Sequence, residues 1–160
     1  MTVAFIGWMK MNNKVFNTEF EISMRLLLLL SQSKNKKFTF DNLVTADFIS
    51  NYSKEFGLSH NNLHGENEFS FSEFSARRAL AQNAIKQLVL ENMVNVSYSK
   101  EGFIYSITER GKSLSSSLAS DYANEYRMYA QKAVAYMDSK SEKELLNLVN
   151  QEASKSTRKE

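Results

Sequence analysis

The spacing of hydrophobic positions changes between Ser72 and Gly111, and this change is the clearest indication of the fold. The first apolar residues recur every three to five positions, which is typical of one buried helix face: Leu80, Ala84, Ile85, Leu88 and Val89. Beyond about Asn92 apolar residues alternate with polar ones in two runs, which predicts two strands: Val94, Val96 and Tyr98, then Phe103, Tyr105 and Ile107. Lys100-Glu101-Gly102 lies between the runs, and Gly102 can take the positive φ of a tight turn.

Thr108 to Gly111 follows the second strand directly and begins another helix. Helix, β-hairpin and helix in this order form the second half of a winged helix. The predicted fold class is therefore mainly α with a small β-hairpin: a winged-helix-like domain followed by a long C-terminal helix. A winged helix can read DNA or bind other proteins, so this fold class does not decide the function.

The preceding part of the chain supplies two further predicted helices. Phe20 to Leu30 is apolar almost all round, which indicates a helix central to a core or held between the core and a partner. Asn17-Thr18 offers its N-cap, and Thr18 with Glu21 has capping-box spacing. Asp41 can cap a second helix that ends near Ser53. The loop from Phe56 to Phe71 is longer than a helix-turn-helix allows, which argues against a standard DNA reader.

A fourth helix is predicted from about Glu109 to Asp138. About thirty residues at ~1.5 Å rise give roughly 45 Å, longer than a small domain needs, so the far half should meet a partner. Ser141 with Glu144 predicts a cap for a short last helix. The resulting division is an N-terminal arm at 1–14, a winged-helix-like domain at 15–111, a C-terminal helical extension at 112–150 and a disordered tail at 151–160.

The composition argues against several classes of protein. The 160-residue chain has a net charge of +2 and no cysteine, which is a weak basic footprint for a dedicated nucleic-acid binder. Its five glycines form no phosphate-binding loop, and its longest apolar run, Leu26 to Leu30, is far too short for a membrane span. We expect a cytoplasmic protein without a cofactor and without membrane contact.

Candidate chemistry is sparse. His60 and His64 are the only histidines, in a segment rich in Gly and Asn, and no third strong metal ligand accompanies them. No serine stands beside a recognisable base and orienting group. We therefore predict no catalytic residues, no metal site and no enzymatic activity.

Two sets of residues are candidates for binding. A DNA-facing patch would comprise Arg77, Arg78, Lys86, Lys100 and Arg110, although acidic residues are interleaved with them. Tyrosine and methionine are enriched at protein interfaces, and the tyrosines of the long helix recur at helical spacing, so core and interface are both open for them. The candidate partner-contacting residues are Phe16, Phe20, Arg25, Tyr122, Tyr126, Tyr129 and Tyr136.

The segment from Val15 to Leu30, VFNTEFEISMRLLLLL, resembles the opening of the middle components of bacterial ABC three-component systems, which typically begin FN[ST]xFExxxRxLxLL. The resemblance extends to about Met137 through five short matches: Asp47-Phe48, Leu63-His64-Gly65, Ala76-Arg77-Arg78, Tyr105-x-Ile107-Thr108-x-x-Gly111 and Leu118-x-Ser120-x-Tyr122. Within this group the chain looks most like the small accessory subunit of Lamassu-type anti-phage and anti-plasmid complexes.

The resemblance implies a non-catalytic accessory subunit. Such a subunit would bind an SMC/Rad50-like ATPase, help to hold a nuclease effector, and meet double-stranded DNA through the complex, with at most weak direct contact. The alternative is a dimeric winged-helix transcription regulator with Arg77 and Arg78 in the DNA groove. It differs in predicting sequence-specific DNA binding by the isolated protein.

Overall fold

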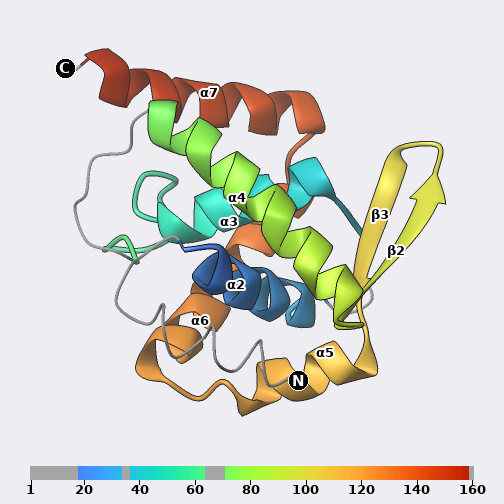
Figure 1. Ribbon diagram of the computed structural model, residues 1–160. Helices are drawn as coiled ribbons and strands as arrows, with labels where there is room; N and C mark the ends of the chain where they lie inside the picture. The colour runs from blue at the N-terminus through green and yellow to red at the C-terminus, as the bar shows by residue number, and fades with distance from the viewer. Residues whose placement is uncertain (1–17, 34–36, 64–70, 159–160) are drawn as a thin grey trace.

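Helix α2 (Glu19–Ser31) lies at the centre of the molecule (Figure 1). The computed structural model describes residues 18–33, 37–63 and 71–158; the predicted arm at 1–14, Phe16 and His64 lie outside them. The Thr18 hydroxyl accepts a hydrogen bond from the Glu21 backbone N–H at 3.1 Å, which confirms the predicted N-cap. Every residue from Ile22 to Leu30 is buried, as expected of a helix that is apolar all round.

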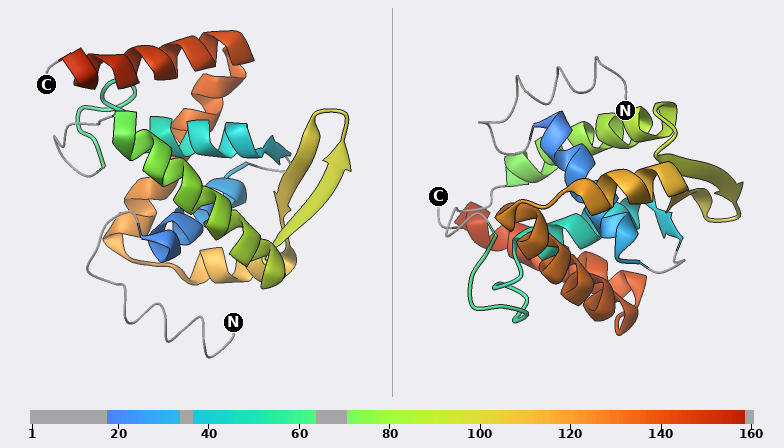
Figure 2. Two further views of the ribbon diagram at one scale, coloured as in Figure 1. Left: turned by 45° about the horizontal axis from the view of Figure 1, so that its top comes forward. Right: turned by 90° about the horizontal axis from the view of Figure 1, so that it is seen from below.

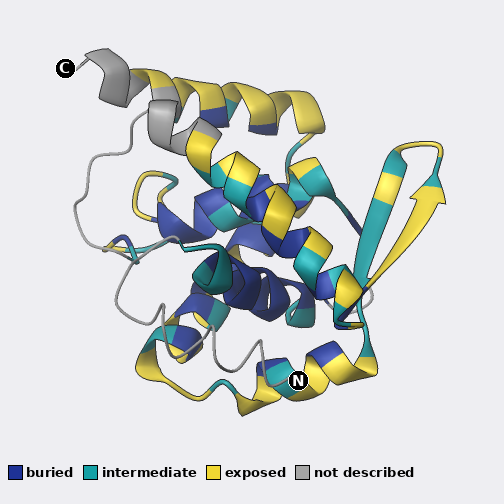
Figure 3. Cartoon of the chain, viewed as in Figure 1, coloured by how far each residue is buried: buried dark blue, intermediate teal, exposed yellow. Residues whose placement is uncertain are grey.

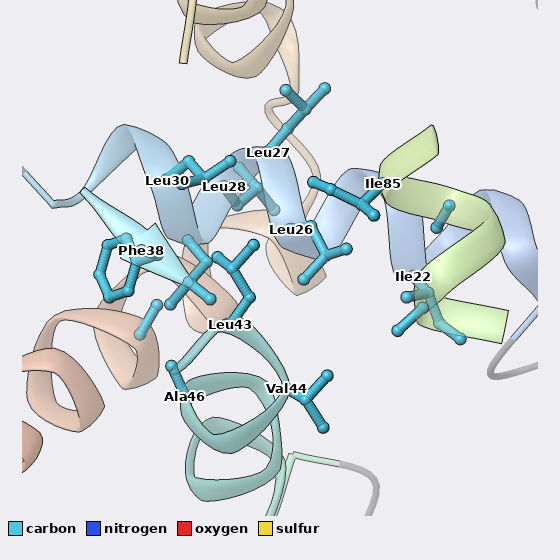
Figure 4. Close-up of a cluster of buried hydrophobic side chains, with 14 of the residues drawn as sticks. Ile22, Leu26, Leu27, Leu28, Leu30, Phe38, Leu43, Val44, Ala46 and Ile85 are labelled. Atoms are coloured by element: carbon cyan, nitrogen blue, oxygen red, sulfur yellow. The ribbon is translucent and has the colours of Figure 1, made fainter. Parts of the chain in front are cut away.

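Three helices lie around α2 and pack against it: α3 (Phe40–Asn51), α4 (Phe71–Leu90) and α6 (Asp121–Asp138). Figure 4 shows the centre of this packing, where leucines of α2 meet Leu43 of α3 and Ile85 of α4. Leu27, Leu29, Leu43 and Leu88 are completely buried. The predicted helix from Ser72 to about Asn92 is thus α4, and the faces predicted to be apolar form the core.

A three-stranded antiparallel sheet closes one side of the body. Its strands β1 (Phe38–Thr39), β2 (Val94–Ser99) and β3 (Gly102–Ile107) lie in the order β1-β3-β2. β2 and β3 pair from Val94 opposite Ile107 to Ser99 opposite Gly102, and Gly102 has φ +98°. The predicted hairpin and its glycine turn are confirmed, and the molecule is mainly helical with a small sheet.

The start of α3 differs from the prediction. β1 was not predicted, because two residues are too few to show alternation. The cap of α3 is Thr39 rather than Asp41: its hydroxyl accepts from the Asn42 N–H at 3.1 Å, while the Asn42 side chain accepts from the Thr39 N–H at 3.4 Å. This reciprocal pair satisfies two backbone donors at once, which a cap at Asp41 does not achieve.

The predicted helix from Glu109 to Asp138 is wrong, because the chain forms two helices, α5 (Glu109–Ser117) and α6. Ser120 caps α6 by accepting from the Ala123 N–H at 3.1 Å. The Arg127 guanidinium donates to the backbone carbonyls of Ser115 and Leu118, which satisfies carbonyl groups at the end of α5. The break therefore has capping partners on both sides, and it removes the overlong helix whose far half was expected to meet a partner.

The last helix, α7 (Glu142–Arg158), also differs from the prediction, since a disordered tail was expected from residue 151. Glu, Gln, Ala, Lys and Arg are good helix formers, and no Gly or Pro interrupts this part of the sequence. The Ser141 hydroxyl accepts from the Glu144 N–H at 3.2 Å, as predicted for its start. α7 lies beside α4 (Figures 1 and 2), and its Val149 packs with Phe48 of α3 and with Tyr52, the C-cap of that helix.

The predicted C-terminal extension contributes to the same hydrophobic core as residues 18–111, where the sequence predicts a winged-helix-like domain. Tyr126, Ala130 and Ala133 of α6 are completely buried and belong to the cluster formed around α2. Figure 3 shows how burial differs between helices: α2 is largely buried, and α7 is largely exposed on its outer side. The hairpin of β2 and β3 projects beyond this body (Figures 1 and 2).

Candidate functional site

A buried polar cluster joins three helices. Arg25 of α2 is completely buried, and its Nε and Nη2 atoms donate to Oδ1 and Oδ2 of Asp47 in α3 at 2.9 and 3.0 Å. Its Nη1 atom donates to Oε1 of Glu21 at 3.1 Å. From α6, the Tyr126 hydroxyl donates to Asp47 Oδ1 at 2.7 Å and the Tyr122 hydroxyl donates to Glu21 Oε1 at 3.0 Å. The cluster therefore ties α2 to both α3 and α6.

The electrostatics of the cluster keep its ions charged and its phenols neutral. Burial by itself would raise the pKa of Asp47, but the charge and hydrogen bonds of Arg25 hold it below its usual value. The pKa of Arg25 is raised by Asp47 in spite of burial. The pKa values of Tyr122 and Tyr126 are raised by burial and by the nearby carboxylates. None of these shifts moves a group toward neutral pH, and the cluster is a structural tie between α2, α3 and α6.

The depressed pKa of Asp47 predicts a loss of stability in acid. The Asp47 pKa is lower in the folded chain than its unfolded value of about 3.9, so Asp47 stabilises the fold above that pH. This contribution is lost as the pH falls through the folded-state pKa. We expect urea titrations of the wild type from pH 6 down to about pH 3 to show a steeper fall in unfolding free energy than those of Asp47→Asn. Parallel curves for the two proteins would contradict this prediction.

Candidate metal ligands among the described residues are His60 and the Asp and Glu side chains. Among them, no group of three or more His, Cys, Asp or Glu side chains could hold a metal ion. His60 is exposed. No helix in the described ranges is long and apolar enough to cross a membrane.

Three of the six described candidate partner-contacting residues are buried, and the other three are half-buried. Arg25 and Tyr126 are completely buried and Tyr129 is 6% exposed. Tyr122 is half-buried in the polar cluster, Phe20 is half-buried against the core, and Tyr136 contacts the ring of Phe56 at 5.9 Å. Because α6 packs along α2 and α3, its tyrosine stripe is an internal face. Buried residues such as Arg25 and Tyr126 are not available to a partner on this surface.

Two of the five candidate DNA-facing residues contact side chains of α3 or of its C-cap, and the other three are exposed on different elements. Arg78 forms an ion pair with Asp41 and lies over the Phe40 ring at 5.0 Å. Arg77 lies over the Tyr52 ring at 5.5 Å, so both arginines point toward α3. The remaining three are exposed on three different elements, the helix α4, the hairpin turn and the start of α5: Lys86, Lys100 and Arg110.

A groove of about 720 Å³ opens between α3, α7 and the hairpin turn. Its charged lining consists of Asp41, Arg78, Glu101 and Glu142, and Leu146 adds an exposed apolar side chain. Among the described residues that line the groove, the cationic one is Arg78, and its pairing with Asp41 makes the lining a poor site for a phosphate.

Residues 15–159 match the family model described as ABC-three component (ABC-3C) system Middle Component 2. The chain belongs to this family. No curated protein and no solved structure matches this middle component.

The motif positions that first indicated the middle components have structural roles in this chain. Thr18 and Ser120 cap helices, and Glu21, Arg25, Asp47 and Tyr122 belong to the buried cluster. Thr108 caps α5 by accepting from the Gly111 N–H at 3.0 Å, and its own hydroxyl donates to the Asn92 carbonyl at 2.7 Å. These positions therefore help to specify the fold of the middle component.

Two members of the cluster, Glu21 and Asp47, were quoted in the motifs but not selected as site residues. Glu21 stands four residues before Arg25, a helical spacing that could have indicated their pairing. No local spacing could identify the partners of Asp47, which lies 22 residues from Arg25 and 79 residues from Tyr126. The available signal was chemical: an arginine within an otherwise apolar helix requires a carboxylate when it is buried.

Proposed function

We propose that this middle component is a non-catalytic subunit of a bacterial defence complex, of the kind found in Lamassu-type systems. It binds an SMC/Rad50-like ATPase and helps to hold a nuclease effector. The observation that carries the proposal is the match to a middle-component family over residues 15–159, because a middle component acts with the other components of its system. Double-stranded DNA would be engaged by the assembly rather than by this subunit alone.

The charge distribution supports a protein-binding role. Net charge is only +2, and Arg77 and Arg78 are held against α3. The exposed apolar side chains belong to the hairpin and to the outer surfaces of helices: Leu90, Val96, Tyr98, Phe103, Met128 and Leu146. Apolar and aromatic groups at exposed positions are typical of protein contacts.

The decisive experiment is co-expression of the chain with the ATPase and effector encoded beside it. A tag on the ATPase should retain both other subunits through size-exclusion chromatography at 0.3 M salt. The control is the same tagged ATPase expressed without the middle component, which should retain less effector. A middle component that elutes alone as a stable monomer and is retained by neither subunit would contradict the proposal.

The second candidate is a winged-helix regulator, favoured by the exposed Lys86, Lys100 and Arg110 around the hairpin. Three phosphate contacts would give a slope of log K against log salt of only about −2.7. We therefore expect the isolated chain to bind a 30-bp duplex weakly and without sequence preference. Fluorescence anisotropy of the wild type and of Lys86→Ala/Arg110→Ala would measure this. Nanomolar binding to one sequence at 0.15 M salt would instead favour the regulator.

A further inference from the structure

Strand β2 is an edge of the sheet without the usual protection. Among the described residues it pairs only with β3, so its outer side presents backbone N–H and C=O groups at alternate residues. Its sequence, VNVSYS, contains no charged residue, no proline and no glycine. Soluble proteins usually guard such an edge with a charge, a proline or a bulge, because an unprotected edge accepts another strand.

One face of the β2–β3 hairpin is apolar along its whole length, including the part that projects away from the helices. At its base Val94 is 2% exposed and lies opposite Ile107. Toward the turn the same face carries Tyr98, 80% exposed, opposite Phe103, 59% exposed. Their ring centroids are 5.6 Å apart in an edge-to-face arrangement. The face that packs on the core at one end is thus left open at the other.

We propose that β2 is a docking edge for an extended segment of another component of the same assembly. The segment adds to the sheet as a further strand, and its backbone pairs with the free edge of β2. Its side chains are uncharged and alternate between apolar and polar, so that apolar ones cover Val96 and Tyr98 while polar ones follow Asn95 and Ser97. This inference rests on the proposed function, since it identifies the surface through which that function is exercised.

The charge of β2 and the area that it can bury favour such a component over nucleic acid and over a second copy of this chain. Nucleic acid requires cations along its backbone, whereas β2 has none and Lys100 stands beside Glu101 at the turn. A second copy joined through β2 alone would bury two six-residue strands, which is well below the ~800 Å² per partner of a stable interface. A component that also contacts other surfaces of this subunit does not depend on the strand contact alone.

The test uses a matched pair of variants in the co-expressed complex with the ATPase and effector. Tyr98→Lys places a charge on the apolar face, and Ser97→Lys places the same charge on the opposite face of the same strand. Both positions are exposed, so both isolated variants should melt like the wild type. We expect Tyr98→Lys to weaken the complex about tenfold or more, and Ser97→Lys to weaken it less than about threefold. Hydrogen exchange of the β2 amides should slow when the complex forms.

The outcomes separate this inference from the proposed function. A complex that forms with equal affinity for both variants, with unchanged exchange in β2, overturns the docking edge and leaves the proposed function standing. If no complex forms with the wild type, both are overturned. Slowing of β2 exchange with increasing concentration of the chain alone, together with sedimentation as a dimer, would make a second copy the occupant. Slower exchange of the β2 amides on addition of a 30-bp duplex alone would make nucleic acid the occupant. Either of these two results overturns the proposal.

Discussion

Replacing Asp47 with alanine should lower the free energy of unfolding by about 3 kcal/mol. The change leaves the completely buried Arg25 without its bidentate carboxylate and the Tyr126 hydroxyl without its acceptor. Loss of one partner of a buried ion pair costs about 3–5 kcal/mol. The lower end applies here, because the Asp47 side chain keeps 14% exposure and Glu21 still accepts from Arg25. Urea denaturation followed by circular dichroism measures the effect.

Two further variants show how much of the Asp47→Ala effect comes from an unpaired buried charge and how much from the loss of one hydrogen bond. Tyr126→Phe removes one hydrogen bond to Asp47 and should cost about 1.5–3 kcal/mol. The double variant Arg25→Met/Asp47→Leu should be more stable than Asp47→Ala, since the completely buried guanidinium is then absent. Glu21 loses Arg25 but is 19% exposed and still accepts from the Tyr122 hydroxyl. If Asp47→Ala unfolds within about 0.5 kcal/mol of the wild type, the ion pair does not hold the three helices together.

Replacing Gly111 with alanine should destabilise the chain by about 1–3 kcal/mol, the cost of forcing extra atoms into a packed site. A Cβ atom built on Gly111 would lie 2.2 Å from the backbone carbonyl oxygen of Met93 and 2.7 Å from the Ile107 side chain. A backbone carbonyl cannot move aside like the end of a flexible side chain, so α5 would have to shift away from the base of the hairpin. Thermal and urea unfolding report the loss.

Helix propensity alone predicts that Gly111→Ala raises stability, whereas the close packing predicts a loss, so the measurement distinguishes the two effects. Alanine is favoured over glycine by about 1 kcal/mol within a helix. The matched control is Ser113→Ala, an exposed position of the same helix, which should be neutral or slightly stabilising. A stabilised Gly111→Ala variant would show that α5 does not pack closely on the residues around Met93.

At these two sites, positions of the family motif hold helices and the hairpin together. Arg25 and Asp47 fix α2 against α3, whereas Thr108 and Gly111 fix the start of α5 against the end of α4 and the hairpin. Variants at these positions are expected to act through folding. Variants at Tyr98, which is 80% exposed, are expected to act through binding. Measuring stability and complex formation on the same variants therefore distinguishes the two roles.

Local patterns in the sequence determined several elements of the structure. The apolar run from Phe20 to Leu30 predicted the central buried helix, and alternation around Gly102 predicted the hairpin. Thr18 and Ser141 were recognised as caps. These features depend on helical or strand periodicity and on hydrogen bonds within a single turn, which a few neighbouring residues specify. The motif spacing likewise indicated the middle-component family that the match over residues 15–159 shows.

Tertiary structure alone decided which side chains are accessible. The tyrosines of α6 suited both core and interface at their helical spacing, and packing against α2 and α3 placed Tyr126 and Tyr129 inside. Arg77 and Arg78 occupied the expected helix but turned toward α3, where aromatic rings and Asp41 receive them. Tyr122 meets Glu21 across 101 residues of sequence. Periodicity shows which face of a helix is apolar, but only the packing of helices shows what each face meets.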